Sequence, residues 1–255
     1  MTKTINPEFR TKVDRLLDEL IVKTYENAPI ARYLLSSSQV DKELFIRHTF
    51  ETILRIRLAR IADSKAINLF TKSDPVAAQK WAKYMEEEML HDRLFLKDLH
   101  NMGVEDEASV YETEPFLATK LLQGYLYYTL DTEGPRGLIC KSYFVEYTTR
   151  KTQMQWNDNI QKSLGEKAVK GAVAHANDDV DEDHSTDVWN VLMSMVSSPE
   201  EEARVLYHLN VYYGLFCAYF TELASTTRGK VAELGEVTKD TVAAAVQGVT
   251  TPPAA

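Results

Sequence analysis

Along most of the chain, apolar residues recur every three or four positions, and short polar interruptions that contain proline or glycine separate these stretches. This spacing places the apolar side chains on one face of an α-helix. The first stretch covers 7–27, and its apolar positions are Phe9, Val13, Leu16, Leu17, Leu20 and Ile21. It ends at Asn27-Ala28-Pro29, because the residue before a proline disfavours the helical conformation. This pattern predicts a first amphipathic helix.

The same periodicity, together with capping residues and prolines, predicts six more helices. We expect them over 41–62, 75–102, 115–128, 136–162, 165–196 and 199–225. Gly171 lies inside the sixth range and is a point at which that helix can break. Leu, Glu, Lys, Arg and Ala fill these ranges, and all five favour helices. The sequence therefore predicts an all-α bundle of about seven helices.

Length and composition indicate one domain. A chain of 255 residues with 44% hydrophobic residues can bury one large core. We predict a helical domain over residues 1–226. Residues 227–255 contain small residues and glycines without a strong apolar stripe. This segment is predicted to be a partly disordered or frayed tail.

Charge and cysteine content limit the partners and the compartment. The net charge of −9 argues against nucleic acid or an anionic membrane as the main partner, so we expect a small-molecule substrate. No apolar stretch approaches the roughly 18 residues that a membrane span needs. Cys140 and Cys217 lie among apolar neighbours and are expected to be reduced, which favours the cytoplasm. A homodimer through outer helices is compatible with this composition.

Four separated segments carry carboxylate or imidazole groups. These groups are Glu51, Glu88-x-x-His91, Glu146 and Asp181-x-x-His184. Residues three or four apart share one face of a helix, so each pair can point inward. Glu146 lies in the apolar and aromatic segment 142–147, where an unpaired carboxylate would be costly to bury. A metal ion, an arginine (Arg55, Arg57 or Arg150) or protonation would remove that cost.

Carboxylates and neutral imidazoles on the inner faces of a helical bundle form a mixed oxygen and nitrogen environment. This environment suits iron or manganese, and one bridging carboxylate can hold two ions. The accumulation of such groups on four helices therefore predicts a metal site.

The order of these residues, followed by the apolar segment 188–192, resembles the haem-oxygenase-like diiron oxidases and oxygenases. That family includes an enzyme that decarboxylates fatty acids to terminal alkenes. The resemblance spans most of 40–225 and implies a haem-oxygenase-like fold, two Fe(II) ions and dioxygen as co-substrate. It implies one iron held by Glu51, His91 and Glu146, and another held by Glu88, Glu146, Asp181 and His184. Glu146 would then bridge the two ions.

The sequence departs from the family pattern His-x3-Asp-x2-His at its first position, where it has Asn177. Asparagine is a poor ligand for iron compared with imidazole, so one of the two ions is expected to be labile. His175 is a substitute ligand only if a π-bulge shifts the helix, because it lies about 200° around the helix from Asn177.

The resemblance implies oxidation of a small amine, amino acid or carboxylate, by N-oxygenation or by oxidative C–C cleavage, in a biosynthetic pathway. Arg55 and Arg150 each lie one turn beyond a predicted ligand, Glu51 and Glu146. A guanidinium makes bidentate contacts with a carboxylate, so these arginines are expected to clamp the substrate.

Two other functions stay open at this point. The first is a metal-free helical enzyme similar to thiaminase II or pyrroloquinoline-quinone synthase, in which Cys140, about two turns before Glu146, would be a nucleophile. The second is a helical protein that binds a partner and catalyses nothing.

Overall fold

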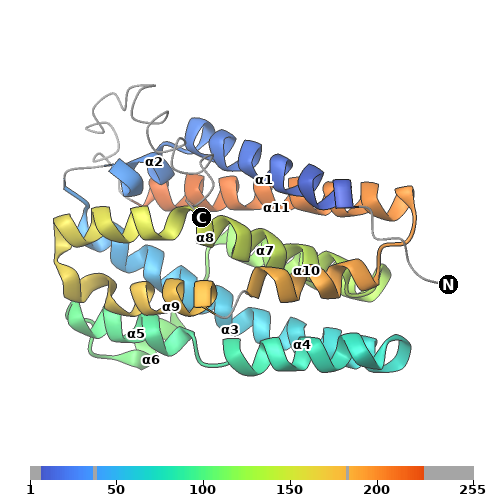
Figure 1. The fold of residues 1–255 in the computed structure, drawn as a ribbon. Coiled ribbons are helices and arrows are strands. Elements are labelled where there is room, and N and C mark those ends of the chain that lie inside the picture. The colour runs from blue at the N-terminus through green and yellow to red at the C-terminus, as the bar shows by residue number, and fades with distance from the viewer. Residues whose placement is uncertain (1–6, 37–38, 182–183, 227–255) are drawn as a thin grey trace.

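A computed structural model describes residues 7–36, 39–181 and 184–226, and Figure 1 shows their arrangement. The predicted tail, 227–255, lies outside the described residues. The described part contains helices and no strand, which confirms the all-α prediction. The helices are α1 (Pro7–Asn27), α2 (Pro29–Ser36), α3 (Lys42–Ser73), α4 (Pro75–Glu88), α5 (Asp92–Asn101), α6 (Glu107–Glu112), α7 (Leu117–Thr132), α8 (Arg136–Leu164), the 3₁₀ helix η1 (Glu166–Val169), α9 (Lys170–Asp181), α10 (His184–Ser194) and α11 (Pro199–Ser225).

The centre of the bundle is α8, which packs against α1, α2, α3, α7, α9, α10 and α11. Figure 1 shows α3, α4 and α5 along one side of the bundle and α1 with α11 along the opposite side. The apolar stripe of α1 is buried as its spacing predicts, since Phe9, Val13 and Leu17 are at most 2% exposed. Burial of such side chains is the main driving force for assembly.

The range 75–102, predicted as one helix, consists of two helices. Between α4 and α5 the backbone forms bonds between residues three apart, from His91 N to Glu88 O (3.3 Å) and from Leu94 N to His91 O (3.1 Å). These bonds close a tighter turn than an α-helix does, so the chain changes direction there. Glu88 therefore ends α4, and His91 lies in the turn before α5.

The range 165–196 begins with the 3₁₀ helix η1 before α9, and α10 begins after 182–183, which lie outside the described residues. Gly171 near the start of α9 lies against α5, where a Cβ atom would come within 1.9 Å of the backbone oxygen of Leu94. The buried carboxylate of Asp98 in α5 accepts hydrogen bonds from Gly171 N (2.6 Å) and Ala172 N (2.8 Å). These contacts fix which face of α9 turns toward α5.

Two short helices, α2 and α6, were not predicted, and α3 continues eleven residues beyond the predicted end at 62, to Ser73. It ends where Asp74 accepts a hydrogen bond from Ala77 N (3.1 Å) and so caps the next helix. Among the described helices, none combines the length and apolar character needed to cross a bilayer.

Candidate metal centre

Acidic and imidazole side chains from four regions of the chain converge inside the bundle. One ligand atom each from Glu88, Glu146 and His184 lie within 4.8 Å of one another. A second group with the same spacing consists of Glu88, His91 and His175. The two groups share Glu88, which ends α4, while the other residues come from α8, α9, α10 and the turn before α5.

The two carboxylate oxygens of Glu88 face different histidines. Oε2 lies 3.0 Å from His91 Nδ1, and Oε1 lies 3.3 Å from His184 Nδ1. Burial acts to raise the pKa of Glu88, but contacts with His184 and His91 and the charges of His91 and His175 outweigh it and lower the pKa. Oε1 is buried and makes no well-formed hydrogen bond, so it retains the capacity to bind a cation. Glu88, rather than Glu146, is therefore the residue that the two groups of possible ligands share.

Three further side chains surround this centre and were missed by the sequence analysis. Tyr84 donates a 2.6 Å hydrogen bond to Glu146 Oε1, and burial together with the charge of Glu146 raises the pKa of the phenol well above its usual value. Burial also raises the pKa of Asp63 to about 7, while the charge of Lys141 opposes this rise. Tyr84 precedes Glu88 by four residues, a spacing that places both on one helix face.

Glu51 does not belong to either ligand group, although its burial was expected. The side chain is fully buried, but its oxygens bind Arg47 Nη2 (2.5 Å), Phe116 N (2.9 Å) and Thr119 Oγ1 (2.5 Å). Phe116 is the N-cap residue of α7, so Glu51 caps that helix, where a negative charge is favourable. Of the three ways to stabilise a buried carboxylate, a metal ion, an arginine or protonation, the arginine is the one found at Glu51. That arginine is Arg47.

We expect Glu51→Ala to lower the free energy of unfolding by about 3–5 kcal/mol, because Arg47 loses its ion-pair partner and Phe116 N and the Thr119 hydroxyl lose their acceptor in a buried site. Urea unfolding followed by circular dichroism measures the loss. Glu19→Ala, at an exposed site in α1, is the control and should change stability by less than about 0.5 kcal/mol. A Glu51 variant that keeps its stability but loses bound iron would instead make Glu51 a ligand.

The residues of α9 differ from the expected ligand row. Asn177 is exposed, whereas His175 lies with its ring centroid 4.6 Å from that of His91. The prediction took the phase of this helix from the row of Asn177, Asp181 and His184, which assumed one continuous face across 182–183, residues that lie outside the described part of the chain. The contact of Gly171 with α5 sets the phase instead, and His175 follows Gly171 by four residues. His175 thus faces inward without a π-bulge, while the side chain of Asp181 lies outside the described residues.

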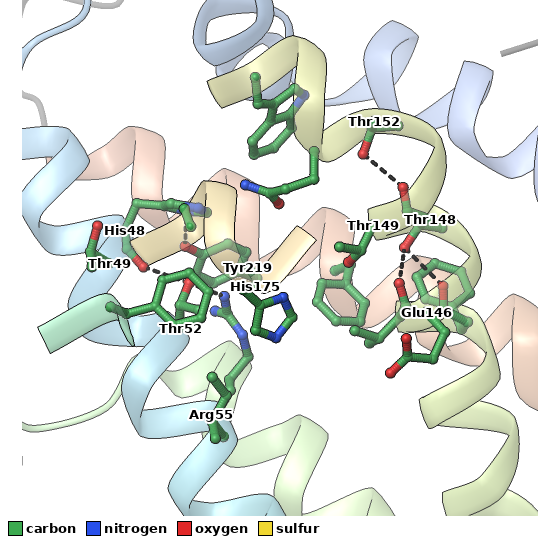
Figure 2. A pocket seen from close by; sticks show the side chains of 18 of the residues that line it. His48, Thr49, Thr52, Arg55, Glu146, Thr148, Thr149, Thr152, His175 and Tyr219 are labelled. Carbon is green, nitrogen blue, oxygen red and sulfur yellow. Dashed lines mark hydrogen bonds between the residues drawn. The ribbon is translucent and has the colours of Figure 1, made fainter. Parts of the chain in front are cut away.

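The ligand groups adjoin a cavity of about 250 Å³, part of which Figure 2 shows. Glu88, Glu146, His175, Lys141 and Arg55 are among its lining residues. Apolar and aromatic side chains form much of the remaining wall, and they include Phe45, Phe95, Phe144, Trp156, Phe216 and Phe220. Such a mainly apolar cavity with a few polar groups is typical of a small-molecule site.

The two arginines expected to clamp a substrate occupy different places. Arg55 lines the cavity, whereas Arg150 is exposed, does not line it, and lies over the ring of Tyr147 at 5.9 Å. Cys140 is fully buried outside the cavity lining, and burial raises the pKa of its thiol. Of these three residues, Arg55 alone can contact a ligand in this cavity, because Arg150 and Cys140 do not line it.

His48 lines the cavity as a neutral imidazole. Its Nδ1 lies 2.7 Å from the hydroxyl of Tyr219, and burial, assisted by the charge of Arg55, lowers its pKa to about 3. The usual value of 6.5 applies to the unfolded chain. Between pH 6.5 and 3 the unfolded chain therefore binds a proton that the folded chain does not, and stability falls as the pH falls.

We expect His48→Asn to remove about 1–3 kcal/mol of this acid-induced loss of stability, because asparagine does not titrate. The measurement is urea unfolding at pH 7, 6 and 5. His100→Asn makes the same substitution at an exposed histidine and is the control. Burial lowers the pKa of His208 to about 4, so both variants should still lose some stability as the pH falls. Identical pH dependence in wild type and His48→Asn would contradict this account.

Comparisons with known proteins support the fold. No known protein-family model matches the chain, and no curated protein sequence matches it. A solved structure that is similar has the description of a domain of unknown function with a haem-oxygenase-like fold, from Shewanella denitrificans OS217. The two share 20% sequence identity at a TM-score of 0.76, over 88% of this chain and 94% of that one. The chain therefore has a haem-oxygenase-like fold, as the resemblance implied.

Proposed function

We propose that this protein is a non-haem diiron oxidase or oxygenase that uses dioxygen to oxidise a small amine, amino acid or carboxylate. The observation that carries the proposal is the pair of ligand groups that share Glu88 and adjoin the apolar cavity. One group offers one carboxylate and two imidazoles, and the other offers two carboxylates and one imidazole. Both donor sets fit iron or manganese.

The residues that would hold the metal ions are Glu88, His91 and His175 on one side and Glu88, Glu146 and His184 on the other. Iron(II) bound there would supply electrons for the reduction of dioxygen. The hydrogen bond from Tyr84 fixes the orientation of the Glu146 carboxylate. The apolar cavity wall excludes bulk water from the substrate.

A metal-free enzyme is the second candidate, and the position of Lys141 favours it. Lys141 lines the cavity, and its charge acts on Asp63 beside Glu88. An ammonium group among carboxylates and imidazoles can balance their charge without a metal ion and can transfer protons. In this alternative, the polar centre would act in acid–base chemistry on a molecule in the same cavity.

Anaerobic titration of the metal-free protein with Fe(II), followed by removal of unbound metal, separates the two candidates. We expect about two irons per chain, one for each group that includes Glu88. Exposure of the loaded protein to oxygen should then produce a transient absorbance. Binding of no iron, with retained circular dichroism, would reject the diiron proposal and favour the metal-free enzyme.

A further inference from the structure

Arg55 is a cation on the cavity wall without a carboxylate partner in the described part of the chain. Its guanidinium lies over the ring of Tyr219, 4.2 Å from the centroid, and its Nη2 donates a 3.0 Å hydrogen bond to Thr52 Oγ1. Its Nη1 is buried and makes no hydrogen bond. A buried charged donor without a partner is unfavourable, so this arrangement indicates a missing acceptor.

Four other part-buried arginines of the bundle have acidic partners. Arg47 pairs with Glu51, Arg60 with Asp92, Arg136 with Glu201 and Arg204 with Glu133. Arg47–Glu51 lies within α3, and the other three pairs join different elements of the bundle, as expected of structural ion pairs. Arg55 contrasts with them because its charge is balanced by no such partner and it faces a cavity. Figure 2 shows its guanidinium on the same side of the cavity as His48 and Tyr219.

Arg55 is the principal charged donor at this end of the cavity, because five of the six lining threonines have no hydroxyl proton left to donate; Thr149 is the sixth. The hydroxyls of Thr24, Thr49, Thr52, Thr148 and Thr152 each donate to a carbonyl oxygen of their own helix. A hydroxyl engaged in this way can still accept a hydrogen bond but has no proton to donate. An anion in the cavity therefore depends on Arg55, while Lys141 lies near Asp63.

This end of the cavity carries a single positive charge, that of Arg55, and so fits a ligand group with one negative charge. His48, the neighbour of Arg55, is neutral at pH 7 because burial and Arg55 itself lower its pKa to about 3. The guanidinium therefore acts alone, which suits a carboxylate better than a dianionic phosphate. Aromatic side chains, Phe45, Trp156, Phe216 and Phe220, continue the wall beyond it and can cover an apolar body.

We propose that Arg55 binds the carboxylate of a monoanionic substrate whose apolar body fills the aromatic part of the cavity. That this ligand is a substrate rests on the proposed function, whereas its binding does not. Arg55 and the metal-ligand groups line one cavity, so a ligand held by its carboxylate at Arg55 can extend toward Glu88 and Glu146. The proposal narrows the substrate class from amines, amino acids and carboxylates to acids with an apolar body.

Isothermal titration of the metal-free protein at pH 7.5 tests this proposal with two probes, 3-phenylpropionate and 3-phenylpropionamide. The probes match in shape but differ in charge. We expect the acid to bind at least about tenfold more tightly than the amide. Arg55→Met keeps an unbranched side chain but removes the charge. This variant should bind the acid only as tightly as it binds the amide. Arg150→Met, at an exposed arginine outside the cavity, is the matched control and should change neither affinity.

Equal affinities for the two probes, no detectable binding of the acid, or an acid preference that persists in Arg55→Met would each overturn the proposal. If Arg55→Met fails to fold, the comparison of acid with amide on the wild-type protein still tests the proposal. Arg55→Gln is then a second variant that also lacks the charge. Because no iron is present, failure here is distinct from failure of the iron titration, which contains no ligand.

Discussion

Glu88→Gln is expected to reduce bound iron from about two ions per chain to nearly none. Glutamine keeps the shape of the side chain but loses the anionic oxygens that face His91 and His184. Because both ligand groups contain Glu88, one substitution removes a ligand from each. The measurement is iron analysis after anaerobic loading, with circular dichroism to confirm the fold.

Matched variants separate the roles of the other ligands. His91→Gln and His184→Gln each alter one group, so each should leave about one iron bound. Glu86→Gln, at an exposed site in the same helix, should retain both ions. Retention of two irons by Glu88→Gln would show that Glu88 does not bridge. Loss of both ions in either histidine variant would show that the two sites do not load independently.

Gly171→Ala is expected to lower the free energy of unfolding by about 2–4 kcal/mol. The added Cβ would come within 1.9 Å of Leu94 O, and a backbone atom cannot move aside as a flexible side chain can. Helix α9 must therefore shift away from α5, which also weakens the hydrogen bonds to Asp98. Since His175 lies on α9, we expect this variant to bind less iron as well.

Gly124→Ala in α7 is the control for this substitution. A Cβ at Gly124 meets no atom within 4 Å, and alanine favours a helix by about 0.5–1 kcal/mol over glycine. The two variants should therefore change the urea midpoint in opposite directions. If Gly171→Ala were as stable as Gly124→Ala, the close packing of α9 on α5 would be refuted.

Much of the fold was predictable because the apolar period of a helix is strong over long segments. The apolar spacing of Phe9, Val13 and Leu17 predicted α1. The Gly134-Pro135 interruption predicted the start of α8. The break after Glu88 was not predicted, because Met89 and Leu90 continue the apolar composition while hydrogen bonds between residues three apart turn the chain. Both are exposed, so their apolar character misled the prediction.

The candidate site was predictable as a set of residue types but less so as a geometry. Glu88, His91, Glu146 and His184 do converge. Glu51 was expected to be a ligand from the order of residues that the resemblance supplied, yet it binds Arg47 one turn earlier and also Phe116 N and Thr119, which lie far along the sequence and which periodicity cannot reveal. His175 was placed outward because its phase was taken from the expected ligand row of Asn177, Asp181 and His184. A glycine four residues earlier, packed on a neighbouring helix, was the signal that would have corrected this.

The helices that line the cavity have different tasks, and α3 supplies Arg55 and His48. The ligand groups come from α4, α8, α9, α10 and the turn before α5, whereas Ile21 and Thr24 on α1 and Phe216 and Phe220 on α11 contribute only wall. Side chains on α1 and α11 can therefore be enlarged or trimmed while the donor atoms keep their positions. Reshaping those two helices offers a route to a different ligand preference with the same metal-binding capacity.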